Sequence, residues 1–132
     1  DLAPVLDAVR QADVLVLATP VYYGDVTGQM KCFVDRTFCY LTPEFKTGPR
    51  RSRLAPGKTL VFVQTQGGPE AAFGDIFQRY QQMMSYHGFA KSICIRGCEL
   101  AAPDEAARRP ELLKRVSEAV RQAMGDGRGA RP

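Results

Sequence analysis

Tryptophan is absent from this chain of 132 residues, and histidine occurs once, at His87. The common phosphate-cradling motifs are missing as well, since neither G-x-G-x-x-G nor a P-loop occurs. No G-x-S-x-G elbow is present, so the single histidine has no obvious nucleophile to activate. Histidine at a helix end is more commonly a cap or a structural side chain. These absences disfavour a hydrolase.

Closely spaced cysteines are also lacking. The four cysteines, Cys32, Cys39, Cys94 and Cys98, form no C-x-x-C pair. This spacing indicates neither a zinc ribbon nor a thioredoxin-type redox site, and we predict no metal site. We expect small buried thiols in a cytoplasmic protein.

Long apolar runs are missing too, because the longest are of strand length. The sequence therefore predicts no transmembrane helix, and its first residues do not have the pattern of a signal peptide. The net charge is +4, and many of its basic residues fall close together: Lys46, Arg50, Arg51, Arg53 and Lys58. Such a cluster can attract phosphates, but it is more often solvated surface. We expect no nucleic-acid partner and no membrane partner.

The most informative stretch is residues 13–36, which runs from an apolar strand through a turn into an amphipathic helix. Residues 14–17 are continuously apolar, as is typical of a strand buried on both faces of a parallel sheet. Pro20 stops the run because it lacks an N–H donor. Open α/β sheets bind ligands at the carboxyl ends of their strands. Residues 19–24 are therefore our first candidate for a binding site.

Strand-length and helical apolar patterns alternate along the chain. They predict helices at residues 2–11, 26–38, 69–87 and after Pro110, and further strands at residues 59–65 and 89–96. Asp25 is suited to be an N-cap, Pro69 to begin a helix and Gly88 to end one. The alternation predicts one α/β domain at residues 1–124, with a parallel sheet between helices. Residues 125–132 should form a disordered tail.

Two turns follow neighbouring strands, at residues 19–24 and 65–68. Because parallel strands end at the same edge of a sheet, the two turns should form one pocket. Its tyrosines, Tyr22 and Tyr23, can stack on a flat heteroaromatic ligand, and the glycines of the second turn let backbone amides approach it closely. Alternatively, the tyrosines cover the sheet edge or lie in a subunit contact.

The segment ADVLVLATPVYYGDVTGQMKCFVDRT resembles the central segment of the flavodoxin-like NADPH-dependent FMN reductase family. This group includes the iron–sulfur flavoproteins and is related to the multimeric flavodoxin-like quinone reductases. Within this segment the matching elements are residues 19–24 and 33–37, and two further matches are residues 65–70 and the join at residues 87–89. The resemblance covers about residues 1–124.

The resemblance implies a flavodoxin-like, doubly wound, three-layer α-β-α fold with strand order 2-1-3-4-5. This chain would hold the last three strands, while the family's first two strands and phosphate loop have no counterpart in it. We therefore expect residues 14–17 to expose a hydrophobic edge, either because the chain is a fragment or because another copy covers the edge. FMN is implied at the carboxyl edge, with its ring held by these residues: Thr19, Pro20, Val21, Tyr22, Tyr23, Gly24, Thr65, Gln66, Gly67, Gly68 and His87.

The implied function is that of an FMN-dependent NAD(P)H oxidoreductase. Hydride would pass from the nicotinamide co-substrate to the flavin, and on to a quinone, a flavin or another small-molecule acceptor. A homodimer or homotetramer is implied. An iron–sulfur cluster stays open, because that branch carries its clustered cysteines upstream. The alternatives are a flavodoxin-type electron carrier and a flavin-free interaction module.

Overall fold

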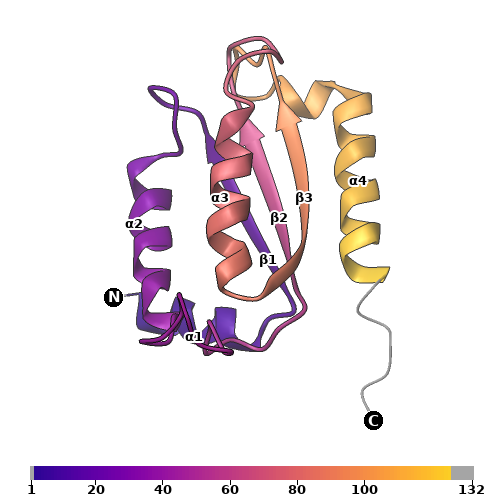
Figure 1. Cartoon of the computed structure of the whole chain (residues 1–132). Helices are drawn as coiled ribbons and strands as arrows, with labels where there is room; N and C mark the ends of the chain where they lie inside the picture. Colours follow the sequence, from indigo (N-terminus) through magenta and orange to yellow (C-terminus); the bar gives the residue numbers. More distant parts are fainter. Residues whose placement is uncertain (1, 126–132) are drawn as a thin grey trace.

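Three apolar segments form a parallel sheet in the order β1-β2-β3 (Figure 1). The strands are β1 (Val14–Pro20), β2 (Lys58–Thr65) and β3 (Phe89–Gly97). This computed structural model describes residues 2–125. The central strand β2 is buried along most of its length, and β1 forms one edge of the sheet. The predicted parallel α/β sheet is confirmed.

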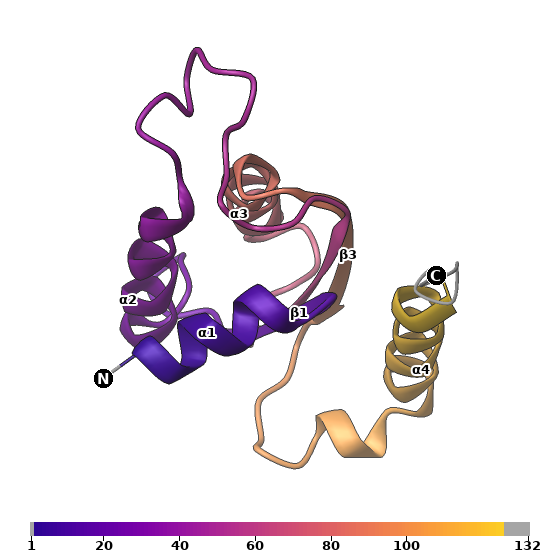
Figure 2. The ribbon, with the colours of Figure 1, turned by 90° about the horizontal axis from the view of Figure 1, so that it is seen from below.

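Helices cover both faces of this sheet. The elements are α1 (Ala3–Gln11), α2 (Gly28–Arg36), the 3-10 turn η1 (Thr37–Tyr40), α3 (Asp75–Tyr86), the 3-10 turn η2 (Ala106–Arg108) and α4 (Pro110–Gly125). Helices α2 and α3 lie on one side of the sheet and α4 lies on the other (Figure 2). The three-layer arrangement is therefore the predicted one.

The core divides into two clusters because β2 points alternate side chains to opposite faces. Leu60 and Phe62 belong to the larger cluster, beneath α2 and α3, and Phe62 stacks on Tyr80 with ring centroids 5.7 Å apart. Val61 faces the smaller cluster, which includes Ala119 of α4. Burial on both faces explains why the β2 sequence reads as an unbroken apolar run.

Strand β1 differs from its prediction in two ways. It runs to Pro20, three residues beyond the apolar run, because an edge strand tolerates a residue that cannot donate a hydrogen bond. The prediction of burial on both faces is wrong for this strand, since Val16 is 57% exposed while Leu17 is buried. The expected hydrophobic edge is thus present in the described residues.

The start of α2 also differs from its prediction. The N-cap is Thr27, whose hydroxyl accepts a hydrogen bond from the Met30 N–H at 3.2 Å. Asp25 was the predicted cap, and that prediction is wrong. Its carboxylate instead accepts the N–H of the adjacent Val26 at 2.7 Å and pairs with a side chain of α3. The predicted helix over residues 26–38 is therefore shorter and continues as η1.

The third helix begins at Asp75 and not at Pro69. The intervening residues form turns, because the side chain of Gln66 faces their carbonyl groups and holds them outside a helix. At the other end, His87 is the C-cap and Gly88 has a φ of +95°. The helix end that Gly88 predicted is confirmed.

All four cysteines are free thiols. Cys32 and Cys39 are exposed, and Cys94 and Cys98 are partly buried. The expectation of buried thiols is therefore wrong for the first two. In α2 the neighbouring Val34 is the residue directed into the core, which leaves Cys32 on the outer face.

Gly125 is the last residue of α4, whereas it was expected to begin the disordered tail. The rest of that prediction, residues 126–132, lies outside the described residues. Among residues 2–125, no helix combines the length and the apolar character needed to cross a bilayer.

Lys58 is buried at the start of β2, although its sequence position suggested a surface cluster. Its Nζ donates a hydrogen bond to the carbonyl of Arg10 at 3.0 Å and another to the carbonyl of Ala12. These carbonyls lie at the carboxyl end of α1, where a cation is favoured by the helix dipole and by unpaired C=O groups. Lys58 thus fastens α1 to the sheet.

Replacing Lys58 with Met should lower the free energy of unfolding by about 1.5–3 kcal/mol, the range for hydrogen bonds to a charged group. Urea denaturation followed by circular dichroism measures the change. Lys46→Met is the matched control, because Lys46 is exposed and its loss should cost less than about 0.5 kcal/mol. Equal effects of the two substitutions would contradict the role given to Lys58.

Candidate functional site

The two predicted turns lie together at the carboxyl edge of the sheet (Figure 1). The Val21 N–H donates a hydrogen bond to the Thr65 carbonyl at 2.8 Å and joins them. Between the turns and the segment after β3 is a cavity of about 440 Å³. It is lined by Pro20, Val21, Tyr22, Thr65, Gln66, Gly67, Leu100, Ala101, Ala102, Pro103 and Ala106. None of these residues carries a formal charge.

The first turn is a two-residue loop closed by hydrogen bonds between Tyr22 and Asp25, with N···O distances of 2.9 and 3.1 Å. Its central residues, Tyr23 and Gly24, have φ values of 50° and 78°. Two positive φ values are the pattern of a type I′ turn, and tyrosine adopts one at a cost of about 1–2 kcal/mol. The turn directs Tyr22 to the cavity, while Tyr23 is fully exposed and does not line it.

Asp25 fastens this first turn to α3. Its Oδ2 accepts a hydrogen bond from Arg79 and its Oδ1 accepts one from the Tyr80 hydroxyl, both at 3.1 Å. Burial raises the pKa of Asp25, but the hydrogen bonds from Val26, Arg79 and Tyr80 outweigh it, so that the pKa lies below its ordinary value. The carboxylate is therefore held in its charged form.

The second turn is held by a buried amide. Nε2 of Gln66 faces the carbonyl oxygens of Gly68, Pro69 and Ala72 at 3.3, 2.7 and 3.1 Å. Its Oε1 accepts hydrogen bonds from Gln64 at 2.7 Å and from Arg96 at 3.2 Å. The amide of Gln66 therefore positions the second turn, and its hydrogen-bonding groups are used within the protein.

The glycines of the second turn keep their N–H groups available. Among the described residues, neither Gly67 nor Gly68 donates a backbone hydrogen bond. The ring of Phe73 lies between the two turns: a Cβ placed on Gly24 would be 3.7 Å from its Cε1, and one on Gly68 would be 3.3 Å from its Cε2. Phe73 has a φ of +60°. Sequence reasoning placed it in a helix and missed this position.

The third wall of the cavity, residues 100–106, was also missed. The Leu100 N–H donates to the Gln66 carbonyl at 3.0 Å, which ties this segment to the second turn. The carboxylate of Glu105 accepts hydrogen bonds from the N–H groups of Ala101 and Ala102 at 2.7 and 3.2 Å. The sequence showed only a polar connection here, because these contacts join residues whose spacing has no periodic pattern.

A family model described as the flavodoxin-like fold matches residues 3–120. The chain belongs to this family. It is 28% identical over 123 residues to an FMN-dependent NADH:quinone oxidoreductase of Ralstonia nicotianae, a match that covers 87% of this chain and 55% of that protein. It is also 43% identical over 37 residues to an iron–sulfur flavoprotein of Archaeoglobus fulgidus, covering 28% of this chain and 18% of that protein.

Among solved structures, an FMN-dependent NADH-azoreductase from Bacillus anthracis in complex with FMN has a TM-score of 0.65 with 17% sequence identity. The likeness covers 97% of this chain and 62% of that one. The predicted flavodoxin-like fold is confirmed. The chain spans about half, or less, of the length of these curated relatives.

The residues predicted to bind the ring differ in where they lie relative to the cavity. Pro20, Val21, Tyr22, Thr65, Gln66 and Gly67 line the cavity. Tyr23, Gly24 and Gly68 belong to the same turns but are not part of its lining, and Thr19 is buried beneath the first turn. Its Oγ1 donates to the Pro20 carbonyl at 2.8 Å and accepts from the Thr27 N–H at 3.1 Å. Thr19 therefore positions the turn and does not face the cavity.

His87 does not join the two turns. It directly precedes β3, at the amino edge of the sheet, whereas the cavity lies at the carboxyl edge (Figure 1). The imidazole is buried against Tyr40 and lies 3.1 Å from the Thr37 hydroxyl. The prediction that His87 shares the site of the turns is wrong for a single chain of this fold, and its structural alternative describes the contacts better.

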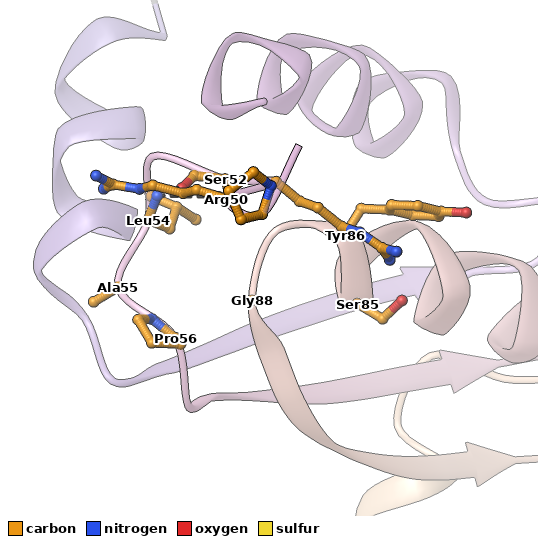
Figure 3. A pocket seen from close by; sticks show the side chains of 10 residues that line it. Arg50, Ser52, Leu54, Ala55, Pro56, Ser85, Tyr86 and Gly88 are labelled. Atoms are coloured by element: carbon orange, nitrogen blue, oxygen red, sulfur yellow. Dashed lines mark hydrogen bonds between the residues drawn. The ribbon is translucent and has the colours of Figure 1, made fainter. Parts of the chain in front are cut away.

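The loop of residues 41–57, which carries most of the basic cluster, lies at the same amino edge as His87 and borders a cavity of about 490 Å³ (Figure 3). Its arginines have separate local partners. Arg50 donates to the Ser52 carbonyl at 3.0 Å, Arg53 donates to the Cys39 carbonyl at 2.7 Å, and Arg51 lies 5.5 Å from the centre of the Tyr86 ring. The guanidinium of Arg50 extends away from Tyr86 (Figure 3). These contacts hold the loop in place and do not converge on one anion.

Substituting Asp25 with Asn should destabilise the protein near neutral pH and have little effect in strong acid. A pKa that folding lowers contributes stability above the unfolded value of 3.8, and this stability disappears as the pH falls through the lower folded value. Urea denaturation of both proteins from pH 7 to pH 2.5 tests this. Asp35→Asn is the control for an exposed helix carboxylate, and a difference for Asp25 that does not depend on pH would contradict the assignment.

Proposed function

We propose that this chain supplies the ring-binding part of an FMN-dependent NAD(P)H oxidoreductase. The observation that carries the proposal is the uncharged cavity of about 440 Å³ between the two turns. Its uncharged lining combines apolar side chains with polar groups that can fix the orientation of a cofactor. The relatives that share the fold include proteins described as FMN-dependent oxidoreductases, which supports the proposal.

The lining of the cavity fits a flavin ring. Pro20, Leu100 and Pro103 supply apolar surface on which a flat ring can lie. The N–H group of Gly67, which lines the cavity, has no acceptor among the described residues, so it can donate to a ring oxygen or nitrogen. The N–H of Gly68, the next residue of the turn, also has no acceptor there. The family's phosphate loop has no counterpart here, and we assign no residue of this chain to the phosphate.

FMN, when bound, accepts hydride from a reduced nicotinamide and passes its electrons to a quinone, a flavin or another small acceptor. The protein's part is to position the ring, to exclude water from its inner face and to stabilise negative charge. Donors from Gly67 and Gly68 are suited to that last task because they are fixed before charge develops. The lining contains no carboxylate, lysine or histidine, so no acid–base pair is assigned.

The edge of β1 supports a second part of the proposal. Val16 is 57% exposed, and an apolar groove of about 390 Å³ runs along β1 between α1 and α2. We propose that another parallel strand, from the same polypeptide or from a second copy in a homodimer or homotetramer, pairs with this edge. The exposed edge is also what favours an interaction module, the alternative to an enzyme.

Amide hydrogen exchange tests the pairing of β1. N–H groups of β1 that are directed away from β2 should be protected if another strand covers them. Rapid exchange of all these groups, with normal protection in β2, would contradict the proposed pairing.

Tyr22 and Tyr23 offer a matched pair for testing the flavin site. Tyr22→Ala should weaken FMN binding about two- to twelvefold, because an aromatic contact contributes about 0.5–1.5 kcal/mol. Tyr23→Ala should change the Kd less than twofold, because Tyr23 is exposed and does not line the cavity. Quenching of flavin fluorescence measures both constants.

The rate of NADH and NADPH oxidation with a quinone acceptor then distinguishes a reductase from an electron carrier and from an interaction module. Turnover that falls with FMN affinity in the Tyr22 variant supports the reductase. Flavin binding without oxidation of either nicotinamide favours a flavodoxin-type carrier. A protein that remains colourless with added FMN refutes the flavin site and favours the interaction module.

A further inference from the structure

The three segments that follow the strands each contain one non-glycine residue with a left-handed backbone. Among the described residues these are Tyr23, Phe73 and Glu99, with φ values of 50°, 60° and 55°. They follow β1, β2 and β3 in turn, so all three belong to the carboxyl edge of the sheet. Side chains disfavour this conformation, which persists where the surroundings enforce it, commonly at functional sites. Of the three, Phe73 has a ring that reaches both turns of the cavity.

Buried side chains hold the backbone of Phe73 in this conformation. Nε2 of Gln64, which is fully buried, donates a hydrogen bond to the Phe73 carbonyl at 3.0 Å. The preceding carbonyl, that of Ala72, accepts hydrogen bonds from Gln66 at 3.1 Å and from Arg96. These donors would lose their partners if the segment relaxed into a helix, so their hydrogen bonds offset the strain. The fold therefore fixes the direction in which the side chain of Phe73 leaves the backbone.

The ring of Phe73 fills the gap between the two turns. Its Cε1 is 3.7 Å from the position of a Cβ on Gly24, and its Cε2 is 3.3 Å from that of a Cβ on Gly68. These two carbons lie on opposite edges of the ring, so the ring spans the distance from one turn to the other. Phe73 is not part of the lining of the cavity. It thus supports both turns from outside the cavity.

Hydrogen bonds join the two turns only at their base. The Val21 N–H donates to the Thr65 carbonyl there, and within the described part of the chain no hydrogen bond connects residues 22–24 with residues 66–68. Each turn is instead fastened elsewhere, the first to α3 and the second to the N–H of Glu99 through the Gly68 carbonyl at 3.0 Å. The spacing of their outer parts is therefore left to packing against Phe73.

We propose that Phe73 is a positioning residue that sets the spacing of the two turns and thereby the fit of the cavity to the FMN ring. The inference rests on the proposed flavin site. A packing role alone explains less, because Phe73 remains 37% exposed although its backbone is strained. A cavity held at a fixed width binds a rigid ring more tightly, since no order has to be created on binding.

Substitutions at Phe73 separate the ring from the backbone. Phe73→Gly removes the ring, and glycine adopts a positive φ without steric cost. Phe73→Asn removes the ring as well, and asparagine also tolerates this conformation, whereas Phe73→Tyr keeps the ring. We expect the Kd for FMN, measured by quenching of flavin fluorescence, to rise about tenfold in the first two variants and to change less than about twofold in the third, because the first two lose preorganisation.

Phe89→Leu is the matched control, because Phe89 is a buried aromatic residue at the start of β3, at the opposite edge of the sheet. It should lower the free energy of unfolding without changing the Kd for FMN. In the protein without flavin, Phe73→Gly should speed amide hydrogen exchange at Val21 and Asp25 relative to β2, and Phe89→Leu should not. The induced circular dichroism of bound FMN at saturation should also change in Phe73→Gly alone.

The possible results distinguish this role from the flavin site itself. Equal Kd values for wild-type protein and Phe73→Gly would overturn the role of Phe73 and leave the flavin site in place. Absence of FMN binding by the wild-type protein would refute both. A loss of affinity in Phe89→Leu as large as that in Phe73→Gly would show that general stability determines the Kd, and would also overturn the positioning role.

Discussion

The buried amide of Gln66 is the constraint on which the cavity between the two turns depends. Its backbone N–H donates to the Gly97 carbonyl and its carbonyl accepts from Leu100, so the ends of β2 and β3 are joined there. Its side chain meanwhile faces the carbonyls of Gly68, Pro69 and Ala72. Since the carbonyls of this loop are turned inward to the amide, N–H groups in the same turn remain available to a ligand. An apolar side chain at position 66 would leave several buried polar groups unpaired, a larger cost than the loss of one hydrogen bond.

Sequence patterns were sufficient for those parts of the fold that depend on periodicity and direction. Unbroken apolar runs marked the strands, and parallel direction placed residues 19–24 and 65–68 at one edge, as the structure has them. Phe73 could not be assigned in this way. Its position depends on Gln66 and Arg96, whose side chains donate hydrogen bonds to carbonyls of the preceding turn, including that of Ala72. Contacts of this kind involve individual side chains and produce no periodic pattern in the sequence, so periodicity cannot predict them.

His87 shows a different limit of prediction from the sequence. The resemblance located the helix–strand join at residues 87–89 correctly, but it suggested a role beside the flavin ring. Direction alone argues against that role within one chain, because a residue directly before a parallel strand lies at the amino edge. Open α/β sheets place ligands at the carboxyl edge. The same histidine is buried at the opposite edge, where its ring contacts Thr37 and Tyr40.

Helix α3 explains how one small domain supports two separate cavities. It runs antiparallel to the strands, so its ends lie at opposite edges of the sheet, about 18 Å apart for twelve residues at 1.5 Å each. Arg79 and Tyr80, in its middle, hold Asp25 and the first turn, and its last residue, Tyr86, lies at the amino edge beside His87. The stacking of Tyr80 on β2 packs the middle of the helix against the sheet. Because dense packing separates the two ends, each cavity can be altered by substitutions that leave the other unchanged.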